Sequence, residues 1–139
     1  MGEESKDLSE LSDSILNSVK KLIGINEEDT SFDLDIIFNI NAAILTMYQL
    51  GIIKKAYTIT SKDDTYQMLM PDCPEEIVNQ TKMYFVYKVR LGFDSSTLTS
   101  NMVQVIKDLI SEAEYRMMIE FNPDNTIKSE ERGEIQNDE

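Results

Sequence analysis

The side chains that could perform chemistry in this chain are carboxylates and one thiol, because the sequence contains no histidine and a single cysteine. Without histidine, the chain cannot build a Ser-His-Asp or Cys-His nucleophile system, and zinc sites made of Cys and His are excluded as well. Three nearby acids, Asp29, Asp33 and Asp35, come closest to a divalent-cation site. Their spacing lacks the glycine turn and the closing glutamate of a calcium loop. We therefore interpret them as the solvated start of a helix, and we expect neither a metal nor another cofactor.

The one thiol, Cys73, lies between Asp72 and Pro74 at the start of a predicted helix. A helix start can lower the pKa of a thiol, but no histidine or second cysteine is present to act with it. Carboxylate pairs are plentiful, so they do not locate a two-acid hydrolase site, and no glycine-rich phosphate loop is present. These observations favour a protein that is not an enzyme.

Basic and aromatic residues gather near the middle of the chain. Arg116 could pair with Glu112 or Glu120 along one helix, or it could form an ion pair across a subunit contact. The aromatic residues could stack on bases, but their segment is the most apolar part of an acidic chain. We favour core packing combined with some subunit interface for this group, which comprises Tyr84, Phe85, Tyr87 and Phe93, with Lys88 and Arg90 between them.

The net charge of −13 is concentrated at the two ends of the chain. Residues 1–35 and residues 108–139 each carry 10 acidic and 3 basic side chains, whereas residues 36–107 are almost neutral. This distribution disfavours binding to nucleic-acid phosphates and to anionic membranes, which needs clustered Lys and Arg. It is compatible with simple solubility or with a basic protein partner.

The length and composition are typical of one helical domain. A chain of 139 residues can bury a core, and 5 Gly and 3 Pro are few for a loop-rich β-sandwich. The first ten residues lack the basic and apolar regions of a signal peptide. No apolar run approaches the ~20 residues of a membrane span. We therefore expect an intracellular protein that does not enter membranes.

Apolar periodicity predicts an all-α bundle of four to five helices. In the fourth helix, alternating residues from Tyr87 to Phe93 also fit a strand, but Pro74 followed by two glutamates is a strong helix start. The second helix has only a narrow polar face, which predicts a central position in the bundle, and its Asn41 predicts a buried hydrogen bond or a subunit contact. The predicted helices cover residues 8–23, 32–50, 61–69, 74–93 and 101–121.

The segments outside these helices complete the predicted domain plan. Residues 52–60 favour extended structure, either a short edge strand or an ordered loop, with its clearest alternation at 56–60. The last residues have almost nothing to bury. We therefore expect one helical domain over residues 1–124 and a flexible acidic tail over residues 125–139, which either keeps the protein soluble or orders on a partner.

Two stretches of the sequence resemble the head–tail connector (adaptor) family of tailed phages and prophages. The first stretch reads SVKKLIGINEEDTSFDLDIIFNINAAILTMYQLGI, and the second joins TKMYFVYKVRLGFDSS to AEYRMMIEFNPD. Together they cover roughly residues 15–124. Ser95 and Ser96 stand where the family commonly has prolines, and Tyr115 stands where tryptophan is common.

The resemblance implies an all-α structural subunit without enzymatic activity. Such subunits assemble into a ring of about twelve beneath the portal protein, extend the DNA channel without binding DNA specifically, and present a docking surface to the stopper or tail. The expected location is the head–tail junction of the virion, with the host cytoplasm during assembly. The expected interface residues are Tyr87, Lys88, Arg90, Phe93 and Arg116, together with Ile127, Lys128 and Ile135 of the tail.

An acidic binding protein is the alternative hypothesis. A protein that mimics DNA or caps a basic partner would carry a similar negative charge. It would be a monomer or dimer, and salt would weaken its binding strongly.

Overall fold

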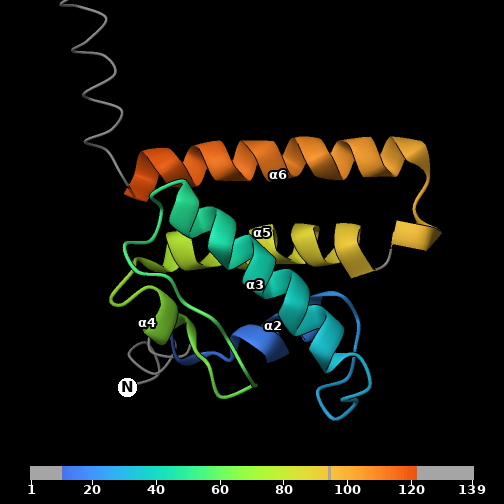
Figure 1. The fold of residues 1–139 in the computed structure, drawn as a ribbon, viewed down its shortest axis with the longest axis horizontal. Coiled ribbons are helices and arrows are strands. Elements are labelled where there is room, and N and C mark those ends of the chain that lie inside the picture. Colours follow the sequence, from blue (N-terminus) through green and yellow to red (C-terminus); the bar gives the residue numbers. More distant parts are fainter. Residues whose placement is uncertain (1–10, 94, 122–139) are drawn as a thin grey trace, which may run out of the picture.

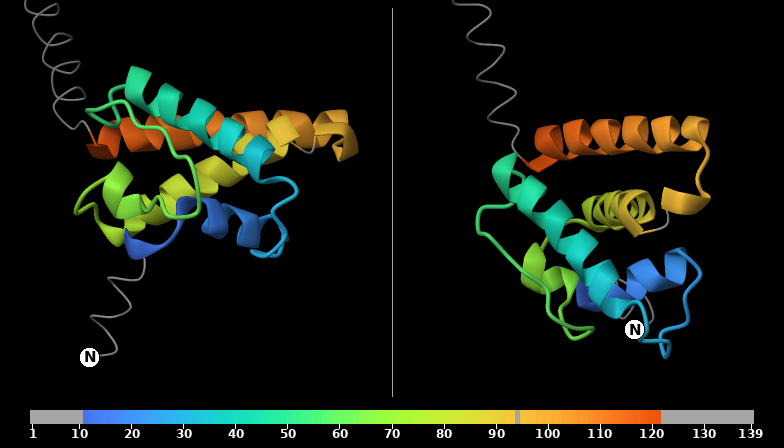
Figure 2. Two further views of the ribbon diagram at one scale, coloured as in Figure 1. Left: turned by 60° about the horizontal axis from the view of Figure 1, so that its bottom comes forward. Right: turned by 45° about the vertical axis from the view of Figure 1, so that its right-hand side comes forward.

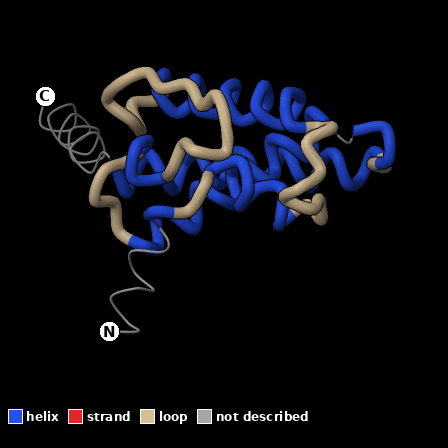
Figure 3. The backbone as a smooth tube through the Cα atoms, turned by 90° about the horizontal axis from the view of Figure 1, so that it is seen from below, coloured by secondary structure: helices blue, strands red, loops and turns tan. Residues whose placement is uncertain are grey.

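A computed structural model describes residues 11–93 and 95–121 of the chain. The predicted all-α fold is confirmed, and the described ranges contain no strand (Figure 3). None of the described helices is long and apolar enough to cross a lipid bilayer. The described helices are α2 (Ile15–Leu22), α3 (Asp33–Gln49), α4 (Tyr66–Leu69), α5 (Glu75–Phe93) and α6 (Ser100–Phe121), with a short 3-10 helix η1 (Ser95–Thr97) between the last two.

Helix α5 is the centre of the bundle, in contact with α2, α3 and α6. Helix α6 runs antiparallel to α5, and α3 crosses α5 obliquely (Figure 1). The strand pattern near the end of α5 was misleading, since residues 87–93 are helical. The helix start at Pro74 was predicted correctly, because the carbonyl of Pro74 accepts hydrogen bonds from the amides of Ile77 and Val78.

The crossing of α3 over α5 depends on a glycine. A β-carbon on Gly92 would collide with the side chain of Asn39. Glycine therefore allows the two helices to approach closely at this point.

Helix α2 begins later than the predicted residue 8. Ser14 has an extended backbone and its hydroxyl accepts a hydrogen bond from the amide of Asn17, which caps the helix. Ser14 also forms an isolated antiparallel bridge with Thr65. Residues 11 and 12 are also helical, so residues 13 and 14 interrupt the predicted helix. The apolar periodicity continues through this interruption, so periodicity alone could not locate it. Gly24 follows the helix with φ +85°, as its predicted place after the last turn requires.

The segment over residues 52–60 is an ordered loop. Asn41 holds it by two hydrogen bonds to Ile59: its Nδ2 donates to the carbonyl at 3.0 Å, and its Oδ1 accepts from the amide at 2.8 Å. The predicted hydrogen bond of Asn41 is thus confirmed, and the side chain is partly buried.

The short helix α4 is capped by Thr65 and begins at Tyr66, whereas the predicted start was at Ser61. Asp64 accepts hydrogen bonds from the amides of Thr60 and Ser61 and from the hydroxyl of Tyr57. These bonds hold residues 60–64 in a turn. Thr65 then caps the helix by accepting from the amide of Met68.

Candidate interaction surfaces

Helix α3 carries apolar side chains on its buried face and also on its outer face. Four large residues form the outer stripe, which we call the α3 ridge: Leu34 is 83% exposed, Phe38 73%, Leu45 53% and Tyr48 43%. Their spacings of four, seven and three residues place them on one side of a helix, as at the a and d positions of a coiled coil. The opposite face packs into the core through Ile36, Ile40, Ala43, Ile44 and Met47.

The ridge corrects the predicted central position of this helix. The narrow polar face was expected to be its only exposed face, yet Leu34 is among the most exposed apolar residues of the described chain. The physical reason is that α3 has more apolar surface than one side of the bundle can cover.

A groove between α5 and α6 forms a second surface, which we call the α5–α6 groove. It encloses about 320 Å³. Its apolar lining consists of Met83 and Tyr87 from α5 and Leu109 and Ala113 from α6, and its polar lining of Glu76, Asn79, Gln80, Glu112 and Arg116.

Hydrogen bonds between the two helices hold this groove in shape. The hydroxyl of Tyr84 donates to Oε2 of Glu114 at 2.9 Å. Burial, reinforced by the charge of Glu114, raises the pKa of Tyr84, so the phenol stays protonated and remains a donor. Gln80 adds a longer bond to Glu120 near the end of α6.

A third surface lies where the start of α3 meets the end of α5. The rings of Phe32 and Phe93 pack edge to face with centroids 5.3 Å apart. Arg90 and Asp35 line the adjoining pocket with Ile23 and other apolar residues.

The predicted interface residues are distributed over these surfaces and do not form one patch. Tyr87 and Arg116 line the α5–α6 groove, where Arg116 pairs with Glu112, one of its two expected partners. Arg90 and Phe93 lie at the third surface. Lys88 is half-buried, with Nζ 5.8 Å from the ring centroid of Tyr84. The remaining predicted residues, Ile127, Lys128 and Ile135, lie outside the described residues.

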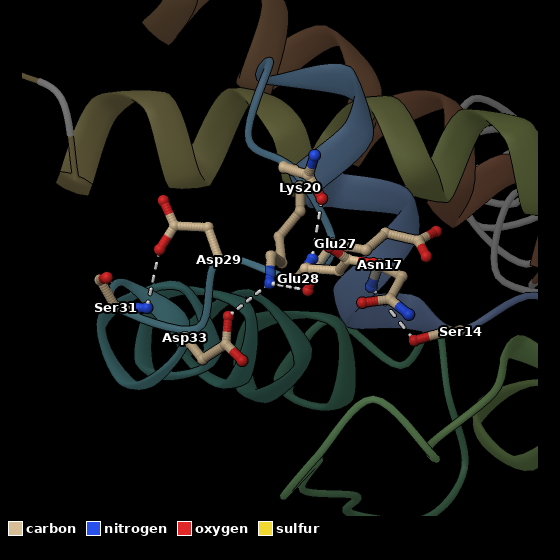
Figure 4. A network of polar contacts seen from close by, with 9 residues as sticks. Ser14, Asn17, Lys20, Glu27, Glu28, Asp29, Ser31 and Asp33 are labelled. Carbon is tan, nitrogen blue, oxygen red and sulfur yellow. Dashed lines mark hydrogen bonds and ion pairs between the residues drawn. The ribbon is translucent and has the colours of Figure 1, made fainter.

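Two of the three acids near residue 30, Asp29 and Asp33, have structural partners. Nζ of the buried Lys20 lies 2.8 Å from Oδ1 of Asp33 and donates to the carbonyl of Glu27 at 2.9 Å (Figure 4). Asp29 accepts a hydrogen bond from the amide of Ser31, and bonds from Ser31 lower the pKa of Asp29. In residues 11–93 and 95–121, no group of three or more His, Cys, Asp or Glu is arranged to hold a metal ion.

The thiol of Cys73 is not activated. Burial, with a further contribution from the charge of Glu120, raises its pKa to about 11. This direction is opposite to the one that a helix start can impose. The thiol is therefore protonated at neutral pH, and a protonated thiol is a poor nucleophile.

The comparisons with known proteins point to one family. A family model described as phage connector protein matches residues 15–124, from the first residue of α2 to just beyond α6. No curated protein and no solved structure matches the chain.

Proposed function

The chain belongs to the phage connector protein family, and from this membership we propose that it forms a ring at the head–tail junction of a tailed phage or prophage. The family match over residues 15–124 is the observation that carries the proposal. In this role the ring sits beneath the portal protein, extends the DNA channel and offers a docking surface to the stopper or tail. The subunit number we propose is about twelve.

The outer face of α3 supports assembly. Asn41, which is bonded to Ile59, separates Phe38 from Leu45 on this face, but a soluble monomer rarely exposes this much apolar surface along one helix without using it. A ring needs a head-to-tail contact between two different surfaces of each subunit. The α3 ridge and the α5–α6 groove are two such surfaces.

The charge supports passage of DNA through the ring. With a net charge of −13 per copy, a ring of such subunits carries a large negative charge, which repels the phosphate backbone of DNA. DNA would then slide through the channel without binding. This property needs no catalytic group, and we propose that the protein has no enzymatic activity.

We also propose different roles for two parts of the chain. Residues 1–124 form the connector domain, and residues 125–139 form a flexible acidic tail that binds a partner in the virion. Its apolar residues, Ile127 and Ile135, would be the anchors, with Lys128 between them.

Light scattering on the purified chain, alone and with the portal protein, tests the proposal. We expect a particle of about a dozen copies, either spontaneously or only when portal is present. A monomer or dimer that does not assemble when portal is added would contradict the proposal. Binding to a partner that is lost at high salt would favour the acidic binding protein.

A further inference from the structure

We propose that the α3 ridge of one copy packs into the α5–α6 groove of the next copy, and that this contact joins neighbouring subunits. The inference rests on the proposed ring and names the surfaces that close it. The occupant of each surface is therefore a second copy of this chain.

The ridge is large enough to be half of a subunit contact. With ~200 Å² for a fully exposed large side chain, the exposed fractions of its four residues amount to about 500 Å². This area lies in the upper part of the range for the largest apolar patch on a monomer. It is also more than half of the ~800 Å² that each partner contributes to a standard interface.

The ridge and the groove lie on opposite sides of the molecule. Gly92 marks the side of α5 that meets α3, because it adjoins Asn39. Met83, which lines the groove, lies nine positions earlier in the same helix, and at 100° per residue this places it about 180° away around α5. The ridge faces away from α5, since the opposite face of α3 is the buried one. Figure 1 shows α3 crossing in front of α5, and Figure 2 shows the same crossing from two other directions.

This placement decides the kind of assembly. If the ridge of one copy fills the groove of the next, each copy still offers one free ridge and one free groove. A contact between two different surfaces continues until a ring closes. A ridge packed against a second ridge would instead stop at a dimer.

The two surfaces also match in length and shape. From Leu34 to Tyr48 the ridge extends about 21 Å along its helix, and from Glu76 to Tyr87 the groove extends about 16 Å. Beyond the end of the groove, Val105 and Met102 continue the exposed apolar surface of α6. A helix that enters the groove between two antiparallel helices completes a three-helix layer by ridges-into-grooves packing.

Cysteine crosslinking tests the contact. In a Cys73→Ala background, Phe38→Cys places a thiol on the ridge and Met83→Cys places one in the groove. The chain that carries both should form a ladder of covalent multimers under mild oxidation, up to the size of the ring. The matched control joins Met68→Cys with Met83→Cys, because Met68 of α4 is 55% exposed and belongs to neither surface.

The crosslinks and the particle mass together distinguish the two proposals. A ladder in the Phe38/Met83 variant, absent from the control, supports the inference. Ring-sized particles without this ladder would overturn the inference and leave the ring intact. Covalent dimers from Phe38→Cys alone would also overturn it, since they report ridge against ridge. Monomers that ignore portal would overturn both proposals.

A second pair of variants does not depend on thiol chemistry. Leu45→Lys places a charge on the ridge, and Met68→Lys places one at an apolar residue of similar exposure in α4, outside both surfaces. We expect Leu45→Lys to raise the protein concentration needed for half-assembly at least tenfold and Met68→Lys to leave it unchanged. Equal effects of the two variants would contradict the proposed contact.

Discussion

The side chain of Asn39 occupies the space that a β-carbon on Gly92 would need: the two atoms, Oδ1 of Asn39 and the added carbon, would lie 2.0 Å apart. Nδ2 of Asn39 donates to the carbonyl of Asp35 at 2.8 Å, which orients the amide. This relationship sets how closely α3 crosses α5. It therefore also sets the direction in which the α3 ridge points away from the bundle.

Exchange of Gly92 for alanine should depend on Asn39. Alanine favours a helix over glycine by about 1 kcal/mol, so Gly92→Ala should stabilise an Asn39→Ala variant by up to that amount. With Asn39 present, the collision should cancel or reverse the gain. Urea unfolding of the four proteins in this double-mutant cycle measures the coupling. Equal stabilisation in both backgrounds would contradict the close approach.

The pair formed by Asn41 and Ile59 should stabilise the loop over residues 52–65. Asn41→Leu leaves the buried backbone of Ile59 without partners, and we expect a loss of about 2 kcal/mol in the free energy of unfolding. Amide exchange of Ile59 should accelerate. Gln49→Leu, at an exposed position of the same helix, is the control and should change stability by less than about 0.5 kcal/mol. Similar losses in both variants would refute the assigned role of Asn41.

Removal of one partner of the ion pair between Lys20 and Asp33 should destabilise the protein more than removal of both. Lys20 is 1% exposed, so Asp33→Asn leaves a buried ammonium without its counter-charge, at a cost of about 3 kcal/mol. The double variant Lys20→Met with Asp33→Asn should be more stable than Asp33→Asn alone. Thermal and urea unfolding can rank the three proteins, and an Asp33→Asn variant as stable as the parent would exclude this effect.

Acid should weaken the turn around Asp64. Burial raises the pKa of Asp64, but the hydrogen bonds from Tyr57, Thr60 and Ser61 together outweigh it and hold the pKa below its ordinary value of 3.8. A depressed pKa contributes stability above pH 3.8, and this contribution disappears as the pH falls through the folded-state value.

Comparison of the parent chain with Asp64→Asn isolates this contribution. The stability difference between the two proteins should be constant above about pH 5 and should shrink below about pH 4. Urea unfolding of both proteins at pH values on either side of this range measures the stability difference. A difference that does not change with pH would contradict the assigned hydrogen bonds.

Local signals in the sequence predicted much of the fold. Pro74 and the glutamates after it located the start of α5, Gly24 located the end of α2, and Asn41 was predicted to make a buried hydrogen bond or a subunit contact. The starts of α2 and α4 were missed, although Ser14 and Thr65 each cap a helix by a local hydrogen bond. What distinguishes them from the other serines and threonines nearby is their pairing with each other across the fold, and a contact between residues so far apart leaves no local pattern.

The candidate surfaces were predicted less well, for a physical reason. The apolar character of α3 was evident, but sequence alone cannot show whether its own chain or another copy covers a given face. The heptad spacing of Leu34, Phe38, Leu45 and Tyr48 was the available signal. The groove joins residues of α5 and α6 that come together only when the helices pair. Tyr87 and Arg116 were nevertheless among the predicted interface residues, and their role in assembly stays a prediction.

Negative-stain electron microscopy of the chain mixed with the portal protein is the first test of ring formation. We expect a closed ring of about a dozen copies, coaxial with the portal and attached to one of its ends. Portal particles without an added ring, at concentrations where the chain is in excess, would contradict it.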